Sequence, residues 1–327
     1  MGWSPKLAVG AWVVGMQADR FMPKGYREFV PTEEKIRRVG SVPGVTGIEL
    51  TFPVDFTTLK ASEVAELLKQ NSLAATDIGL NIFGDVRWKR GSFSNRDDSA
   101  RRAAIDTALA AVEAARVIEA EGLRMWMGQD GFDYPFQVDY RRQRELLIEG
   151  FREVASAAPD LRVDIEYKLK EPRAHSLIDN ASKAILFAQE VGLPNMGVII
   201  DFGHALMSKE NAAEVASLAL QYDLLAGVHF NDAYGDWDDD LIPGTLNLFE
   251  ALEFLCVLRQ ADYQGWLTLD SFPFREDPVE AVKLSIRNTQ GLIEMANRID
   301  LEALKKAQET MDAVATQEVI RKVLFAN

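Results

Sequence analysis

Residues 196–231 read MGVIIDFGHALMSKENAAEVASLALQYDLLAGVHFN, and they contain one full unit of a pattern that runs through the chain. The unit begins with a short apolar run over 196–202, which predicts a buried strand. Apolar residues at spacings of three and four over 209–222 then predict an amphipathic helix, and the apolar run over 225–231 predicts a second strand. Two strands joined by a helix in this way lie parallel in one sheet.

The same alternation extends from end to end of the chain. Eight strands are expected, at residues 7–14, 45–51, 74–82, 122–127, 161–168, 196–202, 225–231 and 265–270. The clearest helical patterns lie at residues 99–120, 138–157, 175–190, 209–222, 246–260 and 278–298. Eight strands that alternate with helices predict an α/β fold, a closed (β/α)8 TIM barrel. An open doubly wound sheet is the alternative, but no glycine-rich phosphate-binding turn follows the first strand.

The barrel is expected to occupy residues 1–299 as one catalytic domain, since barrels of this kind often exceed about 250 residues. Residues 300–327 lie beyond the eighth unit and show an amphipathic helical pattern. We expect them to form a C-terminal helical extension that packs on the outside of the barrel or reaches a neighbouring subunit. The expected assembly is a homodimer or homotetramer.

The composition is that of a globular protein with an acidic surface: 47% of the 327 residues are hydrophobic and 26% are charged. The formal net charge of −14 disfavours nucleic acids and anionic membranes as partners. No apolar stretch of about 18 residues and no signal-peptide pattern is present. The only cysteine, Cys256, lies in an apolar helical segment. A cytoplasmic location is expected.

Charged residues and a histidine stand at the carboxyl ends of four consecutive predicted strands, where barrel enzymes carry their chemistry. The fifth strand carries Glu166 two residues before its end, the sixth has Asp201 at its end, the seventh carries His229 and the eighth ends at Asp270. Burying a lone carboxylate costs several kcal/mol unless it is paired or binds a cation. Three carboxylates and one imidazole suit Mn²⁺, Mg²⁺ or Co²⁺. We therefore expect these residues to hold one divalent cation.

Each of these residues alone also has a structural explanation. Glu166 could form an ion pair with Lys168 or Arg173, the two aspartates could cap the helices that follow, and His229 could be a core histidine. Their joint position at one face of four successive strands favours the metal site.

A second acidic segment, YGDWDDDLIPG at residues 234–244, follows the seventh strand. Asp238 and Asp240 share one side of an extended segment, and we expect them beside His204, with Asp201 shared between two cations. Most charge runs are solvated loops, which is the alternative. The register leaves open which aspartates bind the second ion: Asp236, Asp238, Asp239 or Asp240.

Several segments together resemble the xylose isomerase family and its rhamnose isomerase branch, from about residue 85 onward. The similar segments are WKRGSFSNRDDSARRAAI (88–105), MWMGQDGFDYPFQ (125–137), IEYKLKEPR (165–173), DFGHA (201–205), HFND (229–232), DWDDDL (236–241) and TLDSFPFRED (268–277). The combination is more specific than any one segment.

The resemblance implies a catalytic lysine, Lys168, and one or two divalent ions per subunit, with Mn²⁺ favoured over Mg²⁺ or Co²⁺. A structural ion would be held by Glu166, Asp201, His229 and Asp270. A catalytic ion would be held by Asp201, His204, Asp238 and Asp240. Xylose isomerases have an aspartate where this chain has His229, so the histidine points to the rhamnose isomerase branch.

One departure concerns ring opening. Xylose isomerases carry a histidine after the second strand, whereas residues 48–56 read IELTFPVDF and contain none. Ring opening would then be spontaneous, mediated by water or served by Asp55, or the substrate is a different sugar.

The predicted function is aldose–ketose isomerisation of a small sugar by a metal-assisted hydride shift. Lys168 would donate to the carbonyl oxygen as charge develops there, and an ion pair with Glu166 or Glu171 is its structural alternative. Trp12 and Trp126 would form an apolar wall against the sugar, or belong to the core. The expected catalytic residues are Glu166, Lys168, Asp201 and His204. The expected substrate-binding residues are Trp12, Trp126, Lys168 and His204.

Trp88 and Phe93, in the loop after the third strand, could cover the site of a neighbouring subunit. His175 is expected at the start of a helix and receives no role.

Three other functions stay open. The same barrel could epimerise a ketose, or cleave oxidised C-glycosides by β-elimination with a heteromeric partner subunit. A non-catalytic sugar-binding barrel is the third, although no ligand residue is missing. DNA cleavage on this fold would need a basic face, which the net charge opposes.

Overall fold

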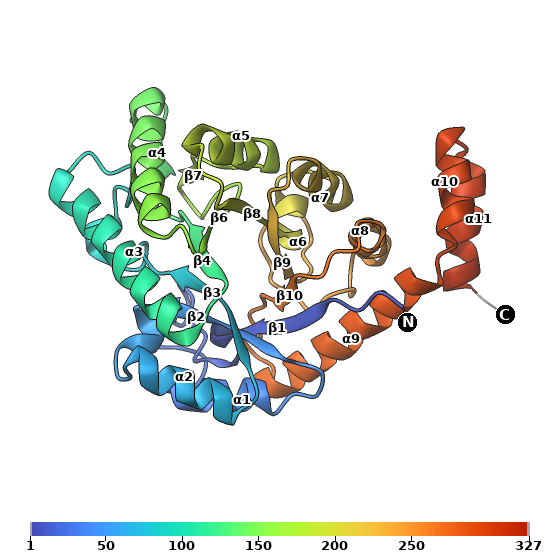
Figure 1. Cartoon of the computed structure of the whole chain (residues 1–327), viewed down its shortest axis with the longest axis horizontal. Coiled ribbons are helices and arrows are strands. Elements are labelled where there is room, and N and C mark those ends of the chain that lie inside the picture. Colours follow the sequence, from blue (N-terminus) through green and yellow to red (C-terminus); the bar gives the residue numbers. More distant parts are fainter. Residues whose placement is uncertain (1, 326–327) are drawn as a thin grey trace.

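The computed structural model describes residues 2–325, and its centre is a closed barrel of eight parallel strands surrounded by helices (Figure 1). The strands follow one another around the barrel in the order of the chain. They are β1 (Lys6–Gly10), β2 (Gly47–Phe52), β3 (Ala74–Leu80), β4 (Gly122–Trp126), β6 (Arg162–Glu166), β8 (Met196–Asp201), β9 (Leu225–Phe230) and β10 (Trp266–Leu269). The predicted (β/α)8 barrel is confirmed.

The helices cover the outside of the barrel. They are α1 (Thr32–Gly40), α2 (Ala61–Gln70), α3 (Asp98–Ile118), α4 (Tyr140–Ala157), α5 (Ala181–Val191), α6 (Phe202–Met207), α7 (Ala212–Gln221), α8 (Leu248–Gln260) and α9 (Pro278–Arg298). Side chains at the helix starts accept hydrogen bonds from otherwise unpaired backbone N–H groups, as Asp97 does for α3, Asn180 for α5 and Asp277 for α9.

The core lies between these helices and the barrel. Ala104, Ala108, Ala111 and Ala115, spaced three or four residues apart, are all buried along one side of α3. Cys256 is also buried, on α8, as expected.

Most predicted bounds differ from the structure by a few residues, and two differences change how the elements are described. The first strand was expected to run to residue 14, but β1 ends at Gly10 and a 3₁₀ turn, η1 (Ala11–Val14), follows. Trp12 therefore projects from a turn at the barrel mouth and not from a strand. Similarly, the predicted helix 209–222 is shorter, because Asn211 caps α7 and the chain first forms the separate short helix α6.

The prediction that His175 begins a helix is wrong. His175–Ser176 form a short strand, β7, which pairs antiparallel with β5 (Gly131–Phe132) outside the barrel. The His175 ring stacks on Phe132 with centroids 5.4 Å apart. The helix starts only after Asn180, whose side chain accepts from the backbone N–H of Lys183.

Trp88 and Phe93 do not extend toward a neighbouring subunit. Trp88 is 3% exposed and Phe93 is fully buried within its own chain, where its ring packs edge-on against Phe151 of α4. The loop after β3 folds back onto the barrel, because burying these large apolar side chains has a lower free energy than leaving them exposed to water.

Beyond α9, two helices lie away from the barrel (Figure 1). They are α10 (Leu301–Glu309) and α11 (Ala313–Leu324), which pack on each other, while α11 also contacts α9. A helical segment is therefore present in the predicted extension. Among residues 2–325, no helix is long and apolar enough to cross a membrane.

Candidate metal centre

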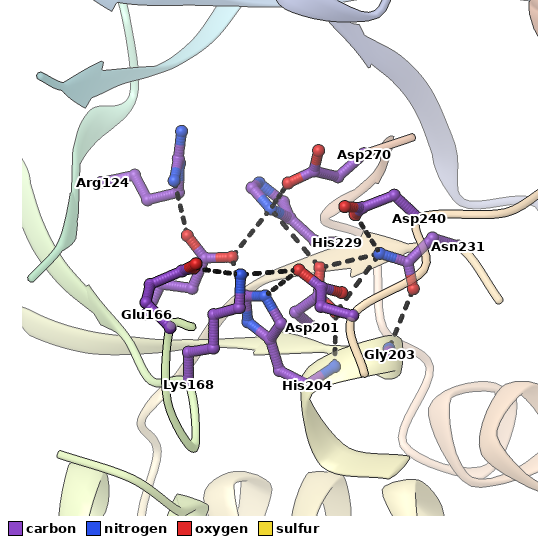
Figure 2. Close-up of polar contacts among 12 residues, drawn as sticks. Arg124, Glu166, Lys168, Asp201, Gly203, His204, His229, Asn231, Asp240 and Asp270 are labelled. Carbon is purple, nitrogen blue, oxygen red and sulfur yellow. Dashed lines mark hydrogen bonds and ion pairs between the residues drawn. The ribbon is translucent and has the colours of Figure 1, made fainter. Parts of the chain in front are cut away.

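Four side chains converge at the carboxyl end of the barrel (Figure 2). Glu166 and Asp201 are the last residues of β6 and β8, His229 lies near the end of β9, and Asp270 directly follows β10. The strand register pairs Asp201 with His229, which brings these two side by side. One ligand atom from each residue lies within 4.8 Å of all the others. We call this group the first cluster.

The first cluster is buried and incompletely hydrogen-bonded. Asp201 is fully buried, and Asp270, the most accessible member, is 9% exposed. Glu166 Oε1 and His229 Nδ1 have no hydrogen-bond partner among the described residues, although His229 Nδ1 lies 3.0 Å from Asp270 Oδ2. Buried polar atoms are rarely left unpaired. Carboxylate oxygens and an imidazole nitrogen that face one point match the ligands of a divalent cation, so these residues fit one.

His229 is oriented by a residue that the sequence prediction missed. Its Nε2 lies 2.9 Å from Oε2 of Glu49, on β2, and this leaves Nδ1 facing the first cluster. A carboxylate on the far nitrogen of a ligating histidine fixes its tautomer and raises its basicity. Burial opposes protonation of His229, but Glu166 and Glu49 outweigh it and raise its pKa well above the ordinary value.

Arg124 of β4, also missed, connects Glu49 with Glu166. Its Nη1 lies 2.5 Å from Glu166 Oε2, and its Nε donates to Glu49 Oε1. Burial opposes ionisation of Glu166, yet Arg124 and His229 hold its pKa well below the usual range. A side chain at Gly79 would collide with the Arg124 guanidinium, so this glycine leaves room for the network.

A second cluster shares Asp201 with the first and adds His204 and Asp238. Asp201 caps α6 by accepting from the backbone N–H of His204 at 2.8 Å, which places the histidine on the first turn of that helix. His204 Nε2 lies 3.1 Å from Asp238 Oδ2. His204 Nδ1 and Asp238 Oδ1 have no hydrogen-bond partner in residues 2–325, so this cluster also has free ligand atoms.

Two ionisable groups of the second cluster have pKa values shifted upward. Burial raises the pKa of Asp201 to about 7, an effect that the nearby His204 partly offsets. Burial lowers the pKa of His204, but Asp201 and Asp238 overcome this and raise it to about 9. Protons thus occupy part of the site at neutral pH, and a cation would have to displace them.

The aspartates of the acidic loop differ in burial and in the groups they face. Asp238 is buried and faces His204, whereas Asp236 is exposed. Asp239 accepts from the backbone N–H of Tyr234 at 2.8 Å, within its own loop. Asp240 lines the cavity described below but is not part of the three-residue cluster.

Asn231, two residues after His229, holds this loop against β8 (Figure 2). Its side-chain Nδ2 lies 3.1 Å from Asp201 Oδ2 and 3.4 Å from Asp240 Oδ1, and its oxygen accepts from the backbone N–H of Gly203. It is the third residue that the sequence prediction passed over.

Lys168 stands at the edge of the second cluster. Its Nζ lies 2.8 Å from Asp238 Oδ2 and 2.6 Å from Glu171 Oε1, and 5.1 Å from the centre of a Trp126 ring. The ion pair with Glu171, which was the structural alternative for Lys168, therefore exists, while Glu166 pairs with Arg124. Burial opposes the charge on Lys168, but Asp238 and Glu171 raise its pKa, so the side chain is an ammonium donor.

Both clusters open into a cavity of about 550 Å³. Trp12 and Trp126 form part of its wall, and Trp12 Nε1 donates to Asp270 Oδ1 at 2.6 Å. The cavity brings together most of the predicted site: Trp12, Trp126, Glu166, Lys168, His204, Asp238, Asp240 and Asp270. Asp201 and His229 adjoin the cavity, because each belongs to a cluster whose other members line it.

Comparison with known proteins gives the family and supports the fold. A family model described as xylose isomerase-like TIM barrel matches residues 39–292. A probable sugar isomerase of Rhizobium meliloti (strain 1021) is 28% identical over 337 residues, covering 96% of this chain and 76% of that protein.

Solved structures show the same fold at low identity. An L-ribulose 3-epimerase superposes with a TM-score of 0.72 at 13% identity, over 95% of this chain and 99% of that one. A D-allulose 3-epimerase from Methylomonas sp. gives 0.69 at 17% identity, over 89% and 100%.

Proposed function

Because the chain belongs to the xylose isomerase-like TIM barrel family, we propose that it is a divalent-metal-dependent aldose–ketose isomerase acting on a small sugar. The observation that carries the proposal is the pair of ligand clusters that share Asp201 beside the ammonium of Lys168, all at one cavity. A buried site with two clusters and a lysine suits chemistry at two adjacent oxygens of a substrate.

The first cluster would hold one ion and the second, with Asp240 as a further ligand, would hold the other. Divalent ions bound there would act as Lewis acids on the carbonyl and hydroxyl oxygens of an open-chain sugar, which favours a hydride shift between C1 and C2. Oxygen-rich ligands with imidazole favour Mn²⁺, with Mg²⁺ or Co²⁺ as alternatives. His229 in the first cluster supports placement near the rhamnose isomerase branch.

Lys168 would stabilise negative charge on the substrate carbonyl oxygen. Asp238 and Glu171 fix its Nζ on one side, so its remaining N–H can point into the cavity. A donor that is already oriented and charged before the reaction needs no reorganisation, which is the main source of this kind of catalysis.

The two tryptophans would keep water from the reacting carbons. Trp12 is held by its bond to Asp270, and Trp126 by the edge-on ring of Phe83, whose centroid is 4.4 Å away. Flat apolar walls suit the C–H face of a sugar and disfavour proton exchange with solvent.

The test uses Lys168→Met and reaction in D₂O. Lys168→Met should keep metal binding but lose most turnover, and the wild-type product should carry little deuterium, since a hydride shift moves hydrogen directly from carbon to carbon. Unchanged turnover in the variant would remove Lys168 from the mechanism. Full deuterium incorporation at C1 or C2 of the product would replace the hydride shift by proton transfer.

A second candidate is epimerisation of a ketose, and one feature favours it. Glu166 and Asp270 approach the same nitrogen of His229, with Glu166 Oε1 at 3.2 Å and Asp270 Oδ2 at 3.0 Å from its Nδ1. Two carboxylates at one ion could act as base and acid on opposite faces of a carbon. Inversion at C3 of a ketose with solvent deuterium incorporated there would select this reaction.

A further inference from the structure

A buried ion pair on the cavity wall takes no part in either cluster. Lys35 Nζ lies 2.7 Å from Asp55 Oδ1, and both residues line the cavity. Lys35 is 9% exposed and Asp55 is 1% exposed. Lys35 comes from α1 and Asp55 from η2 (Val54–Phe56), the segments that follow β1 and β2.

Asp55 is a fixed anchor for the lysine. Its Oδ2 accepts from the backbone N–H of Thr51 at 2.8 Å, and Thr32 Oγ1 lies 3.3 Å from Oδ1. Lys35 has three N–H donors, and only Asp55 accepts one among the residues that the structure describes. Two donors of a nearly buried ammonium are thus left without a protein acceptor.

Stability alone gives little reason for this arrangement. A buried ion pair is often no more stabilising than apolar residues of similar volume. The same wall also carries Asn81, whose Oδ1 accepts from the backbone N–H of Gly84 while its amide nitrogen has no acceptor among residues 2–325. These donors line the cavity and are available to the acceptors of a ligand.

The charge of the pair restricts what that ligand can be. Asp55 neutralises Lys35, so the pair offers no net attraction for a phosphate or carboxylate. A hydroxyl group can accept from Lys35 and donate to Asp55 at the same time. The matching chemistry is the hydroxylated chain of an uncharged polyol.

The position relative to the clusters determines which end of a sugar is bound. The clusters lie on or next to β6, β8, β9 and β10, whereas the pair follows β1 and β2, and β1 is the neighbour of β10 in the closed barrel. We propose that Lys35 and Asp55 form a subsite that binds hydroxyls at the far end of the substrate chain and so sets the chain length that is accepted. This inference rests on the proposed function, which places the reacting carbons at the clusters.

The test is the double variant Lys35→Met with Asp55→Asn, which removes both charges and leaves no buried carboxylate unpaired. Its matched control is Lys183→Met with Asp179→Asn, a surface ion pair with a 2.7 Å contact on and before α5. Aldoses of three to six carbons are compared by kcat/KM in metal-loaded protein. A hydrogen bond from a charged donor corresponds to about tenfold to hundredfold in binding. We expect that loss for long substrates, little loss for the triose, and no change in the control.

A binding measurement separates this inference from the proposed function. Titration of metal-loaded protein with a hexitol and with glycerol needs no turnover, and the double variant should lose affinity for the hexitol by about tenfold or more. Failure to interconvert any sugar would count against the proposed isomerase function but not against the subsite. The titration would then show whether the subsite exists. Equal kcat/KM losses at every chain length would overturn the inference. So would hexitol binding that is absent in wild type or unchanged in the variant.

Discussion

The variant Glu49→Gln tests whether metal binding depends on Glu49, which belongs to neither ligand cluster. Glu49 is fully buried and lies 2.9 Å from Nε2 of His229, while its other oxygen accepts from Arg124. Glutamine keeps the size of the side chain but removes the charge. His229 would then be a weaker and less firmly oriented ligand.

The expected loss of metal affinity follows from the role of a residue that contacts a metal ligand and not the metal itself. Loss of a carboxylate behind a ligating histidine typically lowers metal affinity by about 10- to 100-fold, which corresponds to about 1.4–2.7 kcal/mol. Screening by water cannot reduce the effect much, because Glu49 and His229 are both buried. Arg124 would retain its pair with Glu166, so the barrel interior should stay folded.

The assay is calorimetric titration of chelator-treated protein with Mn²⁺, accompanied by a thermal unfolding curve. Glu113→Gln, an exposed position on α3, is the control and should bind as wild type does. Affinity in Glu49→Gln within about twofold of wild type, in a protein with an unchanged unfolding curve, would refute the argument that Glu49 supports the site.

Three further outcomes are expected. Metal affinity should rise with pH between about 6 and 9, because a cation must displace protons from Asp201 and His204. The pKa values of these residues are raised to about 7 and about 9. A metal affinity that stays constant with pH, measured by titration in several buffers, would contradict this. Burial raises the pKa of Asp77 to about 7 and of Asp164 to about 6. At these two residues the folded state therefore binds protons more tightly than the unfolded chain does. The free energy of unfolding should fall as pH rises from about 4 to about 7. Asp164→Asn should flatten that fall in denaturant melts, and an unchanged slope would argue against it. Deletion of residues 300–327 should reduce the number of subunits per particle, as measured by light scattering, if α10 and α11 join subunits, whereas an unchanged number of subunits would place them on the outside of one barrel.

The barrel and the first cluster could be predicted from the sequence for the same physical reason. Parallel strands bring their carboxyl ends to one rim, so Glu166, Asp201, His229 and Asp270 meet there once the strands are located. Charged residues at the ends of apolar runs are conspicuous in a linear pattern. The bounds of the helices were not needed to predict where these four residues meet.

Glu49 and Arg124 escaped prediction because they lie within strands and not at their ends. In GIELTF and GLRMW each is the one charged residue of its strand, and a linear pattern does not say that both point into the barrel. Only the closed sheet brings β2 and β4 to the same interior. An arginine inside a predicted barrel strand was nevertheless a signal, since a buried guanidinium requires carboxylate partners.

The wrong predictions concern loops, where local pattern and tertiary packing compete. His175 follows the polar run KEPRA, and its segment pairs with Gly131–Phe132, far away in the sequence. Trp88 and Phe93 looked available for a neighbour because they belong to a long loop, but their size makes burial in their own core the stronger force.

The most direct test of the isomerase is metal-dependent turnover. Chelator-treated protein is assayed with a panel of aldoses and ketoses, with Mn²⁺, Mg²⁺ and Co²⁺ added back separately. We expect no activity without metal and restored interconversion of an aldose with its ketose, strongest with Mn²⁺. Tight metal binding with no interconversion of any sugar on the panel would contradict it.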